Sequence, residues 1–321
     1  MRPVIACRRM RVSLSRLLLS LMLVAASGCS LKRMAVNSVA NSLASGGDVF
    51  ARDDDPELVR DALPFGLKTM ESLLETVPKH RGLLLTACQG YTQYAYGFIQ
   101  LEAERVEPTN YDEATRLQGR ALRLFLRARD FGVRGLEVKH PGLARRLPAR
   151  PDSAVRALRR EEVPWIYWTA VAWGSAINLG KDRPDLTADI DVVKALITRG
   201  LELDEGYQQG ALHEVMIVME SLPPAMGGSP ERAHQHFVRA IDLSHGERSS
   251  PYVTFAQSVS VATQNRHEFR QLLQKALAVD PDKNPSRRLE TLLVQRKART
   301  LLAREDELFL EPDTSTVEES R

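Results

Sequence analysis

The chain has 321 residues, of which 43% are hydrophobic and 26% are charged. This composition predicts a folded globular body and excludes a wholly disordered chain. Three cysteines are too few for a disulfide scaffold. The formal net charge of +3 includes five arginines among the first 28 residues, and without them 39 basic residues face 41 acidic ones. A general nucleic-acid binder would keep a basic excess, so we expect no nucleic-acid partner.

The N-terminus has the pattern of a secretory signal peptide. Arginines precede an apolar stretch over residues 17–26, which is too short to span a bilayer as a helix. Small residues then lead to Cys29, and this arrangement resembles the bacterial lipobox, in which the cysteine is acylated and becomes the new N-terminus. The sequence therefore predicts a signal peptide over 1–28 and a lipid anchor at Cys29. The alternative is an ordinary cleaved signal with an incidental cysteine.

The predicted anchor implies a periplasmic location on a membrane. Ser30 follows Cys29, and in the lipobox pattern the absence of aspartate at this position implies sorting to the inner leaflet of the outer membrane. Residues 29–55 are expected to form a tether between the anchor and the folded body. Both Met1 and Met10 are compatible with the start of the signal peptide.

Helical periodicity dominates the rest of the chain. Asp55 and Pro56 are typical of a helix start. Apolar residues follow at the spacing of one helical face, at Val59, Leu63, Leu67, Met70, Leu74 and Val77. Two further stripes of this kind run over 84–101 and 117–131. No sustained two-residue alternation predicts a strand, so the fold class that we expect is all-α.

Proline marks several predicted boundaries. Pro64 interrupts the first helical run and predicts a kink or a restart. Residues 132–151 are rich in Pro, Gly and Arg, and we expect loops with one short helix there. Three further helices are expected to begin with a capping residue followed by proline, at Ser229-Pro230, Ser250-Pro251 and Asn284-Pro285.

One segment, over residues 163–179, is apolar almost all round and holds all three tryptophans of the chain. It begins with a proline after two glutamates, which favours a helix start. A helix that is apolar on every side is buried on every side. We therefore expect this helix to be the centre of the fold.

The C-terminal half repeats a six-residue pattern at intervals of 40 and then 36 residues. The three copies begin at Arg199, Arg239 and Lys275. Intervals in this range are typical of stacked helix pairs, and Ala233, Phe237 and Ala240 follow the spacing of tetratricopeptide repeats. The sequence therefore predicts a helical-repeat bundle, with degenerate tetratricopeptide-like pairs around the central buried helix.

Motifs of catalysis and cofactor binding are missing. The sequence has no glycine-rich phosphate loop, no H-E-x-x-H, no C-x-x-C and no G-x-S-x-G. His234 and His236 point to different sides of a helix, so they cannot chelate one metal ion together. Glu71 and Glu220, each followed by serine, resemble the catalytic pair of lytic transglycosylases, but the segment that accompanies this pair in that family is missing. We expect no catalytic residue, no cofactor and no metal.

A ligand cavity is the best candidate for a site. Large amphipathic aromatic side chains, with a few polar groups in apolar runs, are typical of a small-molecule pocket. The candidate residues are Tyr91, Tyr94, Trp165, Trp168, Asn178, His213 and Glu220. The alternative is that the aromatic residues form only core, because an apolar helix must be buried in any case.

Several spaced stretches resemble the TRAP transporter TatT component family, and the resemblance covers roughly residues 29–310. They are residues 47–51 with the acidic run 53–57, 164–168 with Trp173-Gly174, 210–214, 227–230, and His236-Phe237 with Ala240. The resemblance implies a periplasmic all-α lipoprotein that forms a trimer, with an apolar-lined, pore-like cavity in each subunit. The implied partner is the periplasmic solute-binding protein of a TRAP transport system. The implied task is to hold or pass a hydrophobic, carboxylate-bearing small-molecule ligand.

Two functions stay open on the sequence alone. One is this accessory role in TRAP transport, and the other is a tetratricopeptide-type scaffold lipoprotein for envelope assembly that holds no ligand. In both cases we expect one helical domain over 56–310. The acidic tail over 311–321 has little to bury and is expected to be disordered.

Overall fold

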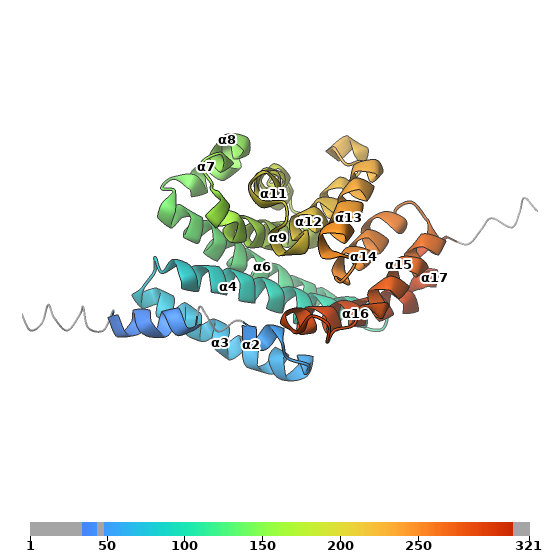
Figure 1. Ribbon diagram of the computed structural model, residues 1–321, viewed down its shortest axis with the longest axis horizontal. Helices are drawn as coiled ribbons and strands as arrows, with labels where there is room; N and C mark the ends of the chain where they lie inside the picture. The colour runs from blue at the N-terminus through green and yellow to red at the C-terminus, as the bar shows by residue number, and fades with distance from the viewer. Residues whose placement is uncertain (1–33, 44–47, 311–321) are drawn as a thin grey trace, which may run out of the picture.

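The computed structural model describes residues 34–43 and 48–310, and every regular element in these two ranges is helical. Figure 1 shows the helices stacked side by side in an elongated body. The predicted all-α class is therefore confirmed. The predicted signal peptide over 1–28, Cys29 and the tail over 311–321 lie outside the described residues. No described helix is both long enough and apolar enough to cross a membrane.

The N-terminal half begins with a helix over residues 34–43. The elements that follow are α2 (Asp48–Ala51), α3 (Pro56–Thr76), α4 (Arg81–Tyr94), the π-helix η1 (Ala95–Gln100), α5 (Leu101–Val106), α6 (Tyr111–Lys139), α7 (Leu143–Ala149), α8 (Pro151–Val155), η2 (Arg160–Glu162) and α9 (Val163–Leu179). Side-chain caps fix three of the starts. The side chains of Asp55, His80 and Asn110 accept hydrogen bonds from the backbone N–H groups at the beginning of α3, α4 and α6.

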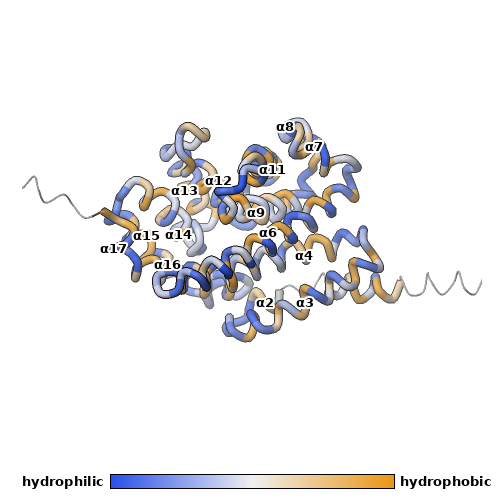
Figure 2. The backbone as a smooth tube through the Cα atoms, turned by 180° about the vertical axis from the view of Figure 1, so that it is seen from behind, coloured by the Kyte–Doolittle hydropathy of each residue, from blue (hydrophilic) through white to orange (hydrophobic). Residues whose placement is uncertain are grey.

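The C-terminal half continues with shorter helices. They are α10 (Pro184–Thr187), α11 (Ile190–Asp204), η3 (Tyr207–Gln209), α12 (Ala211–Glu220), η4 (Pro224–Met226), α13 (Pro230–Ser244), α14 (Ser250–Phe255), the π-helix η5 (Ala256–Ser260), α15 (Arg266–Ala278), η6 (Pro285–Arg287), α16 (Arg288–Ala303) and α17 (Glu305–Leu308). Figure 2 shows hydrophobic and hydrophilic residues alternating along most of these helices, as expected for helices with one buried face.

Helix α9 is the buried centre of the N-terminal half, as predicted. It packs against α4, α6 and α11, and its three tryptophans are each at most 8% exposed. Close approach to α6 depends on two glycines. A Cβ atom at Gly132 would lie 2.2 Å from Thr169 Oγ1, and one at Gly135 would lie 1.8 Å from Cζ3 of Trp165. Glycine at these positions therefore allows α6 and α9 to pack closely against each other.

Two separate groups of buried apolar residues form the interior. The first core extends from Ala40 to Met216 and includes Leu293, and the second core runs from Ile217 to Phe309. Two residues of the predicted tether take part in the first core. Ala40 is fully buried within this core, and Phe50 packs against the core from outside. The described part of the tether is thus packed onto the body, with α2 in contact with α16.

The predicted repeat coincides with helix ends. Its three copies begin at residues 199, 239 and 275 and fill the last turns of α11, α13 and α15, which alternate with α12 and α14. Ala233 and Ala240 are fully buried on α13. Stacked helices are therefore present where the repeat predicts them. The specific tetratricopeptide geometry stays a prediction.

Two predicted boundaries are wrong, and one alternative of a third is excluded. Helix α3 continues through Pro64, so the helix does not restart there, because Val59 and Leu67 on either side are buried in the first core and hold the helix in place. The other alternative, a kink at Pro64, stays a prediction. Residues 132–139 are the last turns of α6, since packing against α9 outweighs the low helix propensity of glycine. Asn284 precedes only the short η6, and α16 begins four residues later.

Replacing Gly135 by Ala should destabilise the protein by about 1–3 kcal/mol, because the new methyl group has no room beside Trp165. Gly66→Ala is the matched control on α3. Nothing lies within 4 Å of its Cβ position, so helix propensity should make that variant more stable by up to about 1 kcal/mol. Urea unfolding of the mature chain, followed by circular dichroism, measures both. Equal stability of the two variants would contradict the described packing of α6 on α9.

Candidate functional site

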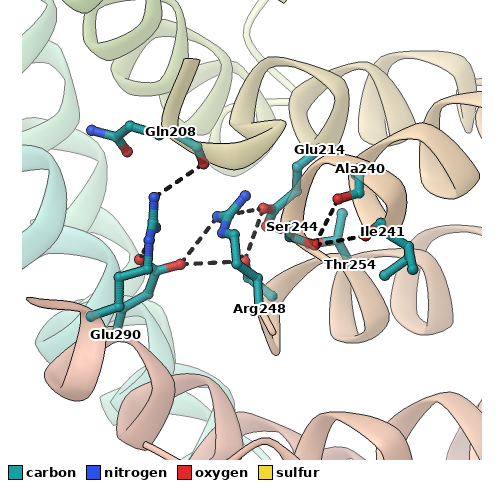
Figure 3. Close-up of polar contacts among 10 residues, drawn as sticks. Gln208, Glu214, Ala240, Ile241, Ser244, Arg248, Thr254 and Glu290 are labelled. Atoms are coloured by element: carbon teal, nitrogen blue, oxygen red, sulfur yellow. Dashed lines mark hydrogen bonds and ion pairs between the residues drawn. The ribbon is translucent and has the colours of Figure 1, made fainter. Parts of the chain in front are cut away.

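A group of charged and hydroxyl side chains lies where the two cores meet. We call it the polar seam, and it consists of Glu214 on α12, Arg248 in the loop before α14, Ser250 and Thr254 on α14, and Glu290 on α16. Figure 3 shows Arg248 between Glu214 and Glu290. Helices α12 and α16 both contribute apolar residues to both cores. The polar seam therefore joins the two halves of the body.

Arg248 is the centre of the polar seam. Its side chain is only 4% exposed, and its Nη2 donates to Glu214 Oε2 at 2.9 Å and to Glu290 Oε1 at 3.1 Å. Burial lowers the pKa of Arg248, but the charges of Glu214 and Glu290 outweigh burial and hold the pKa above its ordinary value. The guanidinium therefore stays charged inside the body.

The two carboxylates of the polar seam have further donors. Ser250 Oγ and Thr254 Oγ1 donate to Glu214 at 2.9 and 3.1 Å, and Arg287 Nη1 donates to Glu290 Oε2 at 2.8 Å. Burial raises the pKa of Glu290, but the charges of Arg248 and Arg287 outweigh it and hold the pKa below its usual range. Both carboxylates are therefore compensated, which is the condition for keeping charge in an interior.

Several buried polar atoms around the polar seam lack a hydrogen-bond partner within the described part of the chain. They are Arg248 Nε and Nη1, Trp168 Nε1 and Gln209 Oε1. The indole N–H of Trp168 lies near the Tyr207 hydroxyl, but the geometry falls short of a hydrogen bond. Gln209 belongs to η3 beside them. Buried polar groups are nearly always satisfied in native proteins, so this neighbourhood has unused capacity to bind water or a polar ligand atom.

Deep side chains in this region keep accessible surface. Tyr96, Tyr167 and Glu290 lie far inside the body, yet 38% of the Glu290 side chain is exposed and the two tyrosines are half-buried. These three side chains are therefore only partly covered by their neighbours. Lys297 Nζ donates to the Tyr96 hydroxyl at 3.3 Å and lies 3.5 Å from Glu104. These contacts add further polar groups along α16.

The structure separates the predicted site residues. Tyr91 and Tyr94 are both buried on α4, where Tyr91 stacks on Phe131 at 5.8 Å and the Tyr94 hydroxyl accepts from Arg120 Nη2 at 3.2 Å. Their polar ends thus point toward α6. Burial raises the pKa of Tyr91 to about 12, with Glu71 adding to the shift.

The three predicted residues of α9 lie in different surroundings. Trp165 fills the space beside Gly135 and lies under the guanidinium of Arg81 at 5.1 Å. Trp168 packs edge-on against Tyr167, with ring centroids 5.0 Å apart, and so borders the polar seam. Asn178 is exposed at the C-terminal end of the helix. Of these three residues, only Trp168 contacts a side chain, Tyr167, that lies close to the charges of the polar seam.

His213 belongs to a histidine pair that the sequence did not predict. Its Nδ1 is 2.8 Å from His236 Nδ1, and its Nε2 is 3.0 Å from Glu205 Oε1. Because a carboxylate can only accept, His213 donates from Nε2 and, when neutral, accepts at Nδ1 from His236. Burial lowers the pKa of both imidazoles; Glu205 opposes the shift at His213, and the neighbouring His213 charge adds to it at His236.

Glu220 is 3% exposed and forms an ion pair with Arg232, whose Nε donates to its Oε2 at 2.8 Å. It is therefore a compensated structural charge between α12 and α13. Glu71, which also precedes a serine, lies on α3 and pairs with Lys68 and Arg127. Among the residues that the structure describes, no group of three or more His, Cys, Asp and Glu side chains has the arrangement of a metal site.

Sequence reasoning missed most of the polar seam. The prediction used Ser250 as a helix cap, but the N-cap of α14 is Ser249, and the Ser250 hydroxyl donates to Glu214 instead. Nothing in the sequence around Arg248 or Glu290 indicates that the two side chains are buried together. They are 42 residues apart, and each resembles a surface residue in its own segment. Only the packing of α12, α14 and α16 shows that these charges are internal.

Comparison with known proteins gives one family match and one similar protein. A family model described as TRAP transporter T-component matches residues 52–309. An uncharacterized protein of Treponema pallidum (strain Nichols) is 29% identical over 304 residues, which cover 89% of this chain and 94% of the relative. The matched range includes the second core, the polar seam, the histidine pair and the part of the first core that follows residue 51.

Replacing Arg248 by Met should destabilise the protein by about 3–5 kcal/mol, because Glu214 and Glu290 lose their shared cation inside the body. Urea unfolding measures the loss. In the double variant Glu214→Gln/Arg248→Met one uncompensated carboxylate is removed, so part of the stability should return. A Met variant that unfolds at the wild-type urea concentration would show that the ion pairs are not buried as described.

The histidine pair should make the protein less stable at pH 5.5 than at pH 7.5. Both folded-state pKa values are lowered below the unfolded value near 6.5. The folded state therefore binds fewer protons, and stability falls as the pH drops below about 6.5. The charged neighbours are Glu205, Arg239, Glu220 and Arg232.

Glu205 does not interfere in this range, because Arg239 and His213 lower its pKa to about 2. Urea unfolding at the two pH values measures the difference. His236→Phe keeps an aromatic ring and should reduce the pH dependence, whereas His267→Phe, on the exposed face of α15, should leave it unchanged. An unchanged dependence in His236→Phe would refute the role of the pair.

Proposed function

The chain belongs to the TRAP transporter T-component family, which gives it an accessory role in a TRAP-type transport system, and we propose that it acts there as a periplasmic lipoprotein. In this role it binds the solute-binding protein of the system and holds or passes a hydrophobic small-molecule ligand. The observation that carries the proposal is the extent of the family match. Residues 52–309 cover nearly all of the described body, so the accessory role concerns the whole helical structure.

The lipid anchor, the location and the trimer are parts of the same proposal. The anchor is Cys29, the location is the inner leaflet of the outer membrane, and the oligomer is a homotrimer. The lipobox pattern supports the first two, and the family resemblance supports the third. A residue-borne anchor fits a body in which no described helix is suited to cross a bilayer.

We place the ligand beside Trp168 and the polar seam. Two observations support this position: polar atoms without partners gather there, and deep side chains there remain accessible. The apolar part of the ligand would lie against aromatic surface, with affinity of roughly 25 cal/mol per Å² buried. Its polar end would use the free N–H groups of Trp168 and Arg248. Of the predicted ligand residues, this proposal retains Trp168 as a direct contact.

A scaffold without a ligand is the second candidate. The packing of Trp165 against Gly135 favours it, because this part of the aromatic interior is filled. The accessory role predicts a bound hydrophobic small molecule and binding of the solute-binding protein, whereas the scaffold role predicts neither. No catalytic activity is proposed, since the family is one of transport accessories.

The ligand proposal is tested with protein that is expressed with its signal and purified from membranes. Organic extraction and mass spectrometry of the wild type should recover a lipophilic molecule in stoichiometric amount. Trp168→Phe removes the free indole N–H beside the polar seam and should reduce the amount at least about tenfold, the effect of losing about 1.4 kcal/mol of binding free energy.

Trp173→Phe is the matched control on the same helix. It removes an indole N–H that donates to Asp189 at 3.1 Å away from the polar seam, and should leave the recovered amount unchanged. Wild-type protein that is empty and that binds no added fatty acid would support the scaffold instead. Binding of the solute-binding protein is measured separately, by surface plasmon resonance on the immobilised wild type.

A further inference from the structure

One face of α6 carries five arginines. They are Arg116, Arg120, Arg123, Arg127 and Arg134, and we call them the arginine face. At 100° per residue these positions lie within about 60° of one another around the helix, and they extend over roughly 27 Å along it. The opposite side of α6 is buried against α4 and α9. Arg116 pairs with Glu113 on the same helix, so the excess of positive charge lies along the rest of the arginine face.

The arginine face borders an open depression between α3 and α6. The residues that line it are Glu71, Arg123, Leu126, Arg127, Asp130, Phe131 and Arg134. Three guanidinium groups thus surround an apolar floor. The depression lies on the outer side of the first core, away from the polar seam.

A buried tyrosine packs behind Phe131, which lines the depression. Tyr91 is 3% exposed and its hydroxyl has no hydrogen-bond partner within the described chain. Its ring stacks on Phe131 and lies 5.5 Å from the guanidinium of Arg127. The hydroxyl lies near Glu71 and Arg127 at the wall of the depression, in a geometry short of a hydrogen bond. The depression therefore offers guanidinium groups around an apolar floor, and the ring of Tyr91 supports that floor from within the body.

The positive charges of the arginine face are only partly compensated. Arg127 lies 3.3 Å from Glu71, which also pairs with Lys68, and Asp130 pairs with Arg129 outside the face. Arg134 donates to the carbonyl of Pro78 at 3.4 Å and lies over the ring of Phe131, and within the described residues it has no ion pair. Within the described residues, Arg123 has no ion pair. A net positive charge therefore remains at the rim of the depression.

We propose that the arginine face docks an acidic segment of a partner protein, with one apolar side chain seated in the depression and carboxylates on Arg123 and Arg134. Guanidinium groups bind carboxylates in a paired, directional geometry. A concave site with an apolar floor fits a protruding side chain better than a flat membrane. The acidic rim residues Glu71 and Asp130 would repel a uniformly anionic lipid surface, whereas an acidic segment can place its carboxylates on Arg123 and Arg134 alone.

This inference rests on the proposed function, because the partner tested is the solute-binding protein of the transport system. Arg123→Glu/Arg134→Glu should weaken its binding to the immobilised protein at least about tenfold, mainly through slower association. Lys275→Glu/Arg299→Glu is the matched control. It makes the same change of net charge at exposed positions of α15 and α16, and should change the affinity less than about twofold. Binding of the wild type should weaken as salt is raised.

The outcomes separate the two proposals. A wild type that does not bind the solute-binding protein contradicts the proposed function, and this inference with it. A wild type that binds, and whose Arg123→Glu/Arg134→Glu variant binds equally well, overturns the arginine face alone. Vesicles with and without anionic phosphatidylglycerol form a third arm. Loss of vesicle binding in the variant, with unchanged protein binding, would assign the face to the membrane instead. Circular dichroism of each variant confirms that it is folded.

Discussion

A buried charge must be compensated where it lies, and this constraint organises the interior of the protein. Arg248 is almost completely enclosed, so Glu214 and Glu290 have to reach it from two different helices. Each of those helices also contributes to both apolar cores. The ion pairs therefore fix how the N-terminal and C-terminal halves meet. An apolar contact of the same area would allow the helices to slide, whereas hydrogen-bonded charges admit one arrangement.

The same arrangement explains why a site can exist between the halves. Apolar side chains pack until no space is left, as Trp165 does against Gly135. Charged groups with fixed geometry prevent such collapse at the polar seam, and they leave N–H groups without partners. Close packing of apolar side chains thus fills the interior around α9, whereas the paired charges of the polar seam leave Glu290 partly accessible. The arginine face lies outside both, so the partner docking and the ligand holding that we propose would occupy separate parts of the molecule.

Local sequence patterns correctly predicted a helix whose surroundings are the same on every side. The segment around Trp168 is apolar on all sides, and it is helix α9 with the predicted bounds. Patterns failed where an interaction with a distant segment outweighed a local preference. Residues 132–139 look like a loop because of their glycines, but those glycines are the positions where α6 approaches α9. Ser250 has the context of a helix cap, but its hydroxyl is used by Glu214.

The sequence by itself determined the all-α class, the central helix and, through spaced motifs, the family. These properties depend on residue type and on spacing along one helix, which a sequence displays directly. Tertiary structure alone decided which charges are internal and which of the predicted site residues share a neighbourhood. Arg248 and Glu290 become partners only when α14 and α16 pack, and Asn178 is exposed although it lies on the same helix as Trp168. The physical reason is that burial and pairing are set by the surfaces that meet in three dimensions, and a linear pattern does not contain them.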